Sequence, residues 1–445
     1  MGVPNLQRHL ERLESSDRLA VYGKVLDVVG LTIEATGPPT RIGDLCYIQS
    51  NDSTLRIPVE VVGFRGSRIL LMPLADSRGI GPDSVLIPTH APLKLRAGDQ
   101  LIGRVIDGLG NPIDGGPPLQ GGIEVNVMAS APRAMDRRRI TEAISTGVRA
   151  IDATVTCGKG QRIGIMAGSG VGKSKLMGMI ARNTNADVSV IALIGERGRE
   201  VRDFIEVDLG ESGLERSVVV VATSDEPALV RIKGAYLATA VAETFRSQGA
   251  DVMLMMDSIT RFAMAQREVG LAVGEPPTSK GYPPSVFSVL PKLLERAGSD
   301  QSGSITGVYT VLVEADDMTD PIADAVRSML DGHVVLSRDL ASRGHYPAVD
   351  VLESISRVML DVTSEAHREA AAKLRQVMAT YRDAEDLVNI GAYVKGSNPE
   401  IDEALVLMPK IRQFLKQGLF EPSELEGITD GMVQALKLTS SKGRE

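Results

Sequence analysis

The chain contains the segment AGSGVGKSKLMGMIA at residues 167–181, directly after the apolar stretch QRIGIM at residues 161–166. The apolar stretch predicts a strand, and the residues after the glycines predict a helix. Glycines let the backbone curl, so that several N–H groups point at one phosphate chain. The expected helix adds the partial positive charge of its N-terminus. A strand, a glycine-rich loop and a helix in this order predict a site for the phosphates of a nucleotide.

Two side chains at the end of this loop supply what backbone N–H groups cannot. We expect Lys173 to reach the β- and γ-phosphates of ATP, and Ser174 to offer its hydroxyl group to Mg²⁺. The usual pattern GxxxxGK[ST] has a glycine where this chain has Ala167, but alanine still permits the turn because a glycine follows it. The other residues expected to contact the nucleotide are Gly168, Ser169, Gly170, Val171, Gly172 and Lys175.

Two acidic residues complete the expected site. The apolar stretch VMLMMD at residues 252–257 predicts a strand that ends in Asp257, an acid placed to hold Mg²⁺, usually through water. The stretch IALIGERGREV at residues 191–201 presents Glu196 at the end of another strand. A carboxylate there can orient or deprotonate the attacking water. Taken alone, this second stretch fits a solvated charged loop better than a catalytic site, but beside a phosphate loop the catalytic interpretation is favoured.

The amino-acid composition excludes some classes of function. The 445 residues are 43% hydrophobic and 24% charged, as in a globular protein, and 49 basic against 57 acidic residues give a net charge of -8. A mildly acidic chain with no Trp does not fit a dedicated nucleic-acid binder, so we expect no nucleic-acid partner. Cys46 and Cys157 stand far apart and outside zinc-binding spacings, which predicts reduced thiols in a cytosolic protein.

Membrane and secretion signals are not found in the sequence. The first residues, MGVPNLQRHLERLESSDRL, have no apolar core of a signal peptide. No apolar run reaches the length of about 18 residues that a membrane span needs. Any membrane role would therefore act through a partner.

The pattern along the chain changes several times. Residues 1–18 have leucines at helical spacing, which predicts an amphipathic helix that either packs on its own domain, frays, or docks a partner. Residues 19–90 alternate short apolar stretches with glycine and proline, which predicts a small β-barrel. The glycine- and proline-rich stretch at residues 103–122 predicts a connection full of turns.

The remainder predicts an α/β core and a helical end. From about residue 150 to 360, apolar strands alternate with helices, which predicts a mostly parallel sheet covered on both faces. We assign residues 91–360 to this core and residues 361–445 to a C-terminal helical domain. The strands expected in the core are GQRIGIMAG, DVSVIALIG, SVVVVATS, DVMLMMD and GVYTVLVEA.

Several long motifs, together with the phosphate loop, resemble the catalytic β-subunit branch of the rotary ATPases, and resemble its type III export relatives more closely. The resemblance extends from about residue 20 to 435. The motifs are LIGERGREVRDFIE, MMDSITRFAMAQREVGLAVGEPP, TSKGYPPSVFSVLPKLLERAG, DDMTDPIAD and LDGHVVLSRDLASRGHYPAVDVLESISRV.

The resemblance implies a RecA-like P-loop ATPase core with an N-terminal β-barrel and a C-terminal helical domain. It also implies a homohexamer whose ATP sites lie between subunits. By motif, Glu196 is the catalytic carboxylate, Arg197 and Arg261 approach the γ-phosphate beside Lys173, and Tyr346 stacks on adenine.

The resemblance further implies that Arg357 is an arginine finger that reaches the site of the adjacent subunit. Such a cation is worth about 10³–10⁵ in rate, because charge spreads over the γ-phosphoryl oxygens in the transition state. Each assignment has a structural alternative. Arg357 could form an ion pair, Arg261 could cap a helix, and Tyr346 could be a core tyrosine at a proline turn.

Differences among the relatives narrow the function. Glu196 stands where non-catalytic rotary subunits carry Gln, which favours an active enzyme. The stretch YRDAEDLVNIGAYVKGSNPEID at residues 381–402 lacks the acidic lever motif of rotary β-subunits and resembles the export branch. Within that branch, DDMTDPIAD and LVNIGAYVKGSNPEID resemble the flagellar proteins more than the virulence proteins, which remain the alternative.

The resemblance implies an ATPase that energises flagellar export by releasing substrates from chaperones and unfolding them. The implied place is cytoplasmic and peripheral, at the inner-membrane face beside the export gate membrane proteins. Residues 1–18 would meet a stator-like regulatory protein, and a coiled-coil stalk protein would contact the C-terminal domain. A nucleotide-dependent docking scaffold and an RNA helicase-like ring are more remote alternatives.

Overall fold

The computed structural model describes residues 21–50, 56–313 and 320–437. Its contacts divide the chain into two units, one formed by residues 1–93 with 272–274 and the other by residues 94–271 with 275–445. The helix expected over residues 1–18 lies outside the described residues.

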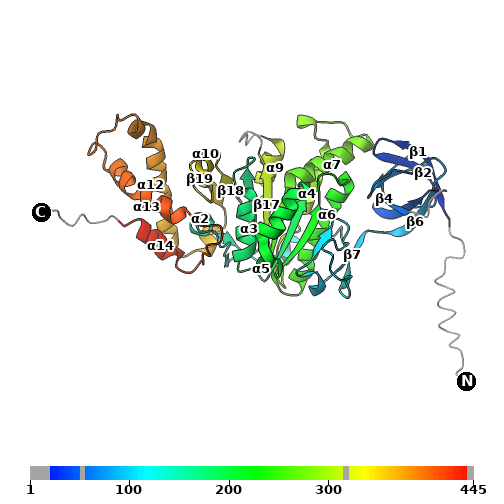
Figure 1. The fold of residues 1–445 in the computed structure, drawn as a ribbon, viewed down its shortest axis with the longest axis horizontal. Coiled ribbons are helices and arrows are strands. Elements are labelled where there is room, and N and C mark those ends of the chain that lie inside the picture. The colour runs from blue at the N-terminus through cyan, green and yellow to red at the C-terminus, as the bar shows by residue number, and fades with distance from the viewer. Residues whose placement is uncertain (1–20, 51–55, 314–319, 438–445) are drawn as a thin grey trace, which may run out of the picture. The chain divides into compact units, whose positions relative to one another are not determined.

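A closed barrel forms the first unit (Figure 1). Its strand order is β1-β2-β5-β4-β3-β6, and neighbouring strands pair antiparallel. Buried side chains of alternating residues fill the interior, as expected for strands with one face turned inward. A small barrel is thus present where the sequence predicted one. The strands are Gly23–Val29 (β1), Thr32–Thr36 (β2), Asp44–Gln49 (β3), Arg56–Arg65 (β4), Arg68–Pro73 (β5) and Val85–Pro92 (β6).

A nine-stranded sheet is the centre of the second unit. Its order is β19-β18-β12-β17-β15-β13-β14-β8, with β16 paired to β17. All pairs are parallel except β18 with β19 and β16 with β17, which are antiparallel. The strands are Val105–Asp107 (β8), Arg162–Ala167 (β12), Val188–Ile194 (β13), Ser217–Ala222 (β14), Asp251–Asp257 (β15), Gly298–Ser299 (β16), Ser304–Leu312 (β17), Gly332–Leu336 (β18) and Val349–Ser356 (β19).

The middle of this sheet is covered on both faces. Successive side chains of a strand point to opposite faces of the sheet. Because every residue of β13 and β14 is buried, both faces must be covered there. Helix α6 packs against β13, β14 and β15 and is itself almost wholly buried. The helices of this region are Arg149–Thr154 (α2), Lys173–Asn183 (α3), Gly198–Asp203 (α4), Gly210–Leu214 (α5), Ala228–Ser247 (α6), Ile259–Val273 (α7), Pro284–Leu294 (α8), Pro321–Met329 (α9), Arg338–Ser342 (α10) and Met359–Val362 (α11).

One expectation for this unit was wrong in part. The stretch at residues 103–122 does contain turns, but Val105–Asp107 forms β8 and pairs parallel with β14 at the sheet edge. Three residues are too few to show a strand period, so only the partner strand reveals this one. Two short antiparallel pairs also belong to this unit. They are Lys94–Ala97 (β7) with Ile123–Asn126 (β9), and Ala143–Ile144 (β10) with Cys157–Gly158 (β11).

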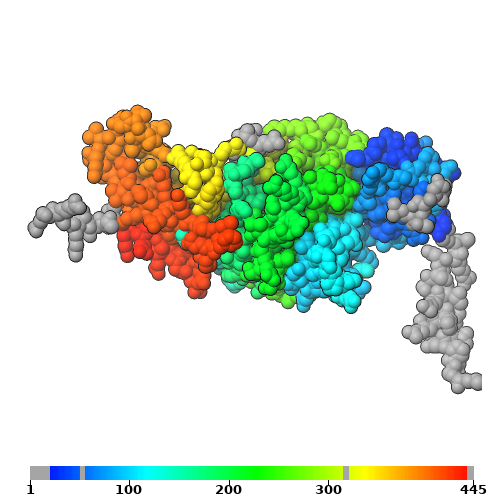
Figure 2. Space-filling model, in the orientation of Figure 1, coloured from blue at the N-terminus to red at the C-terminus, as the bar shows by residue number. Residues whose placement is uncertain are grey.

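Three helices close the described chain: Glu365–Asn389 (α12), Pro399–Leu415 (α13) and Ile428–Ala435 (α14). They pack against one another and against α2, and α12 also contacts β19. In Figure 2 this orange and red part is continuous with the yellow segment that carries β18 and β19. Leu374, Leu407 and Met432 share one apolar cluster with the strands of the sheet, so these helices are anchored to the core rather than tethered beside it.

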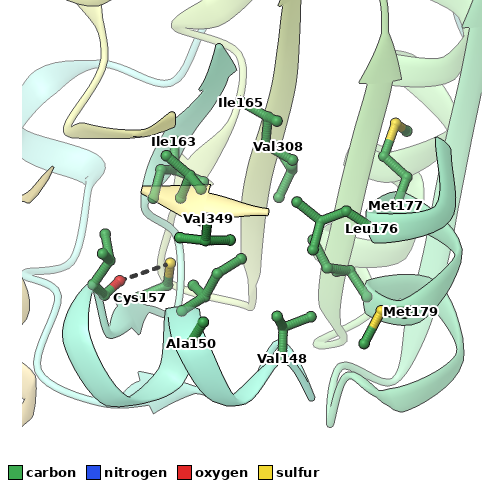
Figure 3. Close-up of a cluster of buried hydrophobic side chains, with 14 of the residues drawn as sticks. Val148, Ala150, Cys157, Ile163, Ile165, Leu176, Met177, Met179, Val308 and Val349 are labelled. Atoms are coloured by element: carbon green, nitrogen blue, oxygen red, sulfur yellow. Dashed lines mark hydrogen bonds between the residues drawn. The ribbon is translucent and has the colours of Figure 1, made fainter. Parts of the chain in front are cut away.

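The apolar cluster includes Ala167 and Val171 of the glycine-rich segment, and Figure 3 shows others of its residues. Ile163 and Ile165 of β12 face Leu176 and Met179 of α3 across it. Cys157 is a free buried thiol whose Sγ donates to the carbonyl oxygen of Val155 at 3.5 Å. Cys46 is also free and buried. Burial, followed by the negative charge of Asp44, raises the pKa of Cys46 to about 11, so that thiol stays protonated at neutral pH.

Candidate functional site

The glycine-rich loop connects the carboxyl end of β12 to the first residue of α3. Gly170 and Gly172 have φ angles of 78° and 95°, a conformation that L side chains rarely adopt. Ala167, in place of the usual first glycine, is the last residue of β12 and packs its methyl group into the apolar cluster. Alanine at position 167 therefore lies in the strand, outside the curled part of the loop that contains Gly170 and Gly172.

Lys173 lies between two carboxylates. Its Nζ forms an ion pair with Asp257 and a second one with Oε1 of Glu196, at 3.4 Å. The side chains of these residues are only 4% to 17% exposed. Lys173 begins α3, Glu196 follows β13 and Asp257 ends β15, so three separate elements bring the charges together. The sequence predicted all three residues, and the structure places them at one point.

Strand order explains why these residues meet. The strand β17 lies between β12 and β15, and β13 follows on the far side of β15. Carboxyl ends of parallel strands share one edge of a sheet, which is where ligands bind in such folds. From β17, the hydroxyl group of Thr310 donates to Oδ1 of Asp257 at 2.8 Å and so fixes the carboxylate. Thr310 was not predicted, although a polar residue inside an apolar strand was a usable signal.

The local electrostatics favour proton exchange at Glu196. Burial, followed by the negative charge of Asp257, raises the pKa of Glu196 to about 7, although the Lys173 ammonium opposes the shift. Burial alone would lower the pKa of Lys173, but the charges of Asp257 and Glu196 outweigh burial and raise it. Lys173 therefore remains a cation, while Glu196 can change protonation near neutral pH, as a general base must.

A cavity of about 1370 Å³ opens over these groups. The glycine-rich loop, Glu196 and Arg261 form one part of its wall, and Tyr346 with the adjoining Pro347 forms another. A Cβ atom added to Gly172 would lie 3.6 Å from the Tyr346 ring, so the loop and this ring are neighbours. Tyr346 is 48% exposed. A half-exposed aromatic beside a phosphate loop can stack on a nucleobase, which is not what a core tyrosine does.

Two of the predicted arginines also border this cavity. The chain reverses at Gly195, where φ is 73°, and a Cβ there would lie 2.7 Å from Cβ of Arg261. The Nε of Arg261 is buried and has no hydrogen-bond partner among the described residues. Arg197 is 80% exposed and pairs with Glu200 at 3.2 Å. Arg261 is thus held close to Glu196, while Arg197 lies at the open rim.

Lys175 and Arg357 are not brought into this group. Nζ of Lys175 pairs with buried Asp208 at 2.5 Å, in the helical turn Phe204–Leu209, although Lys175 borders the cavity. Arg357 follows β19, is exposed, and is not among the residues that line the cavity. Within the described ranges its guanidinium forms no ion pair. Its backbone N–H donates to the carbonyl oxygen of Asp331 at 2.9 Å.

The residues at the acidic end suit Mg²⁺. Ser174, Glu196 and Asp257 border a small hollow of about 10 Å³. The described residues contain no group of three or more His, Cys, Asp or Glu side chains that could hold a metal. Mg²⁺ needs no such cage, because it keeps several waters and takes one or two carboxylates together with phosphate oxygens. One hydroxyl and one carboxylate beside a phosphate loop therefore fit this ion.

Gln417 is a wall residue that the sequence did not predict. It follows α13, is 6% exposed, and lines the cavity beside Tyr346. Its position at the end of a predicted helix carried no local signal of a binding role. Within the described residues, every helix is too short or too polar to span a membrane.

Comparison with known proteins agrees with this geometry. Residues 147–356 match the model of the ATP synthase alpha/beta family, nucleotide-binding domain, and residues 363–434 match the T3SS EscN ATPase C-terminal domain. The "Flagellum-specific ATP synthase" of Bacillus subtilis (strain 168) is 56% identical over 421 residues, which are 94% of this chain and 96% of that protein. This chain belongs to the type III export branch of the ATP synthase alpha/beta family.

Other members of the export ATPase family are similarly close. The "Type 3 secretion system ATPase" of Xanthomonas euvesicatoria is 51% identical over 412 residues, 93% of this chain and 92% of that protein. A solved structure of assembled EscN in complex with its central stalk EscO, from enteropathogenic E. coli, is 45% identical with a TM-score of 0.86. That match covers 93% of this chain and all of the EscN chain. As a family member, this chain is a nucleotide-binding ATPase with the predicted fold.

Proposed function

We propose that this chain hydrolyses ATP to drive flagellar protein export. The observation that carries the proposal is Lys173 held between Glu196 and Asp257 inside a cavity that also contains the glycine-rich loop. Phosphoryl transfer to water needs a cation on the phosphates, an acid that holds Mg²⁺ and a group that orients the attacking water, and these three residues can supply them. The flagellar assignment is supported by 56% identity with a flagellum-specific relative over almost the whole length of both chains.

Each group has a proposed role at this site. The loop N–H groups of residues 168–172 and Lys173 bind the phosphates, and Glu196 accepts a proton from the attacking water. Ser174 and Asp257 hold Mg²⁺, which neutralises charge on the phosphate oxygens. Tyr346 stacks on adenine. The remaining proposed contacts are Arg197 and Arg261 with the γ-phosphate, and Lys175 at the loop end once its pair with Asp208 is released.

We place Arg357 in the site of a neighbouring copy. It is exposed, lies outside its own cavity and forms no ion pair among the described residues, which leaves its guanidinium available to another chain. A closed homohexamer repeats this contact at every interface, because a head-to-tail contact that closes makes a ring. The relationship to EscN, whose solved structure is an assembly, supports this arrangement.

The proposed partners follow the parts of the chain. The C-terminal helical domain, residues 361–445, would meet a coiled-coil stalk protein, since EscN binds its stalk EscO. Residues 1–18 would bind a stator-like regulator, residues 19–90 form the barrel domain, and residues 91–360 form the ATPase core. The ring would act in the cytoplasm, peripheral to the inner membrane, on export gate proteins and chaperone–substrate complexes, and without nucleic acid.

A strain that lacks this chain tests the function. We expect cells that do not swim in soft agar and that retain hook and filament proteins instead of releasing them into the medium. Complementation with the wild-type chain should restore both, and complementation with Lys173→Ala should restore neither. Motile cells with normal filaments would contradict the flagellar assignment. They would favour a virulence system, which the 51% identity with the Xanthomonas relative also supports.

A further inference from the structure

We propose that Gln417 is a positioning residue for the nucleobase, holding Tyr346 in place from the C-terminal helical segment. The inference rests on the proposed function, since it takes Tyr346 as the stacking ring. The backbone N–H of Gln417 donates to the carbonyl oxygen of Tyr346 at 3.0 Å. Leu419, two residues further on, also lines the cavity. The segment at residues 416–421, here called the base strap, therefore forms the wall beside the ring.

The side-chain amide of Gln417 fixes the base strap to the core. Its Oε1 accepts a hydrogen bond from the backbone N–H of Arg149 at 2.8 Å. Its Nε2 donates to the carbonyl oxygens of Gly147 and Glu421, both at 2.8 Å. Both amide hydrogens and the oxygen are used in a buried position, where an unmade bond is costly. A carboxylate keeps the acceptor and loses both donors, whereas alanine loses all three bonds.

The base strap is also attached to the helix that carries the phosphate loop. Arg182, in the last turn of α3, donates to the carbonyl oxygen of Leu419 at 2.5 Å and lies 4.8 Å over the ring of Phe420. Arg149 donates to the carbonyl oxygens of Phe414 and Lys416, each at 3.0 Å. The phosphate loop leads into the first turn of α3, whereas the base strap contacts the last turn of the same helix. A change in the base strap can therefore leave the phosphate loop undisturbed. Losing the Gln417 amide should move the ring and leave the loop in place.

This separation predicts a selective effect. Gln417→Ala should weaken MgATP binding about tenfold, the size expected when buried hydrogen bonds that place a binding group are lost. Binding of inorganic tripolyphosphate, which has no base, should stay within about twofold, and kcat at saturating MgATP should be unchanged. Gln413→Ala is the matched control, because Gln413 lies on the exposed face of α13.

A tryptophan reporter gives a second, direct measurement. The chain contains no Trp, so Tyr346→Trp supplies a single fluorophore at the ring position. MgATP should quench this fluorescence, and adding Gln417→Ala should reduce the quenching at saturation. Tyr346→Ala and Gln417→Ala together should weaken MgATP binding no more than Tyr346→Ala alone, because both act through one wall.

The outcomes separate this inference from the proposed function. Equal losses for MgATP and tripolyphosphate, a fall in kcat, or additive losses with Tyr346→Ala would overturn the positioning role. An unchanged MgATP affinity would overturn it as well. If Gln417→Ala does not fold, Gln417→Met carries the same test, since it fills the same volume without a buried charge and lacks the three hydrogen bonds. Failure of the wild-type chain to hydrolyse ATP would instead refute the proposed function.

Discussion

The ammonium group of Lys173 pairs directly with the carboxylate of Asp257, although the two residues stand 84 positions apart in the chain. Thr310 holds the same carboxylate from the strand between them. A nucleotide with Mg²⁺ would have to exchange this pair for contacts with phosphate and metal. The charges that would meet phosphate and metal are thus already gathered at one point, and their mutual pairing must open when the nucleotide binds.

Glu196→Gln should bind MgATP normally and lower kcat by about 10²–10⁴-fold, the usual worth of a general base. Glutamine keeps the shape of the side chain and cannot accept the proton. Phosphate release and nucleotide binding measure the two effects separately. Glu206→Gln is the control, since Glu206 is a half-exposed partner of Arg202. Near-normal turnover would remove Glu196 from the chemistry, and near-normal export in Glu196→Gln cells would favour a docking scaffold.

The rate should depend on pH through Glu196. Its pKa of about 7 means that the carboxyl group is protonated below that pH and cannot accept a proton from water. We therefore expect kcat/KM for MgATP to fall about tenfold per pH unit below the inflection and to level off above it. Glu200 raises the pKa of Glu196 through a hydrogen bond, so Glu200→Ala should move the inflection to lower pH. A flat profile from about pH 6 to 8 would refute this assignment.

Thr310→Val should raise the Mg²⁺ concentration needed for half-maximal activity several-fold, because Asp257 loses the hydroxyl group that orients it. Thr306→Val is a stringent control. It makes the same change on the same strand, and the Thr306 hydroxyl accepts from the backbone N–H of Gly160, away from Asp257. Titrating Mg²⁺ at saturating ATP measures the effect. Equal shifts in both variants would mean that strand stability, rather than Asp257, is responsible.

Specific activity should rise with protein concentration, since each proposed site needs a guanidinium from a second chain. ATP binding per chain, measured over the same concentrations, should change much less, because the loop and Tyr346 belong to one chain. Specific activity that stays constant on dilution to the monomer would show that each chain is complete by itself.

Local patterns predicted most of the residues that the structure brings together around the cavity. Strong apolar runs predict the strand before the phosphate loop and the strands that lead to Glu196 and Asp257. The contact of Thr310 with Asp257 depends on strand order, which periodicity does not reveal. The three-residue β8 was likewise visible only through its partner strand.

The base strap was beyond sequence reasoning for a related reason. Gln417 bonds to Gly147 across 270 positions, and neither residue carries a local sign of that contact. A residue just after a helix and a glycine just before another helix are common features with many structural uses. Only the packing of the C-terminal helices on α2 brings these two residues together.

The central claim is that the active site is shared between neighbouring copies, with Glu196 from one and Arg357 from the next. Arg357→Ala should fold, bind MgATP and lose about 10³–10⁵ in rate. Mixing it with Glu196→Gln before assembly tests the claim most directly. In random rings roughly one interface in four would combine an intact Glu196 with an intact Arg357. We predict that two inactive proteins regain activity when mixed; a mixture as inactive as each variant alone would contradict the account.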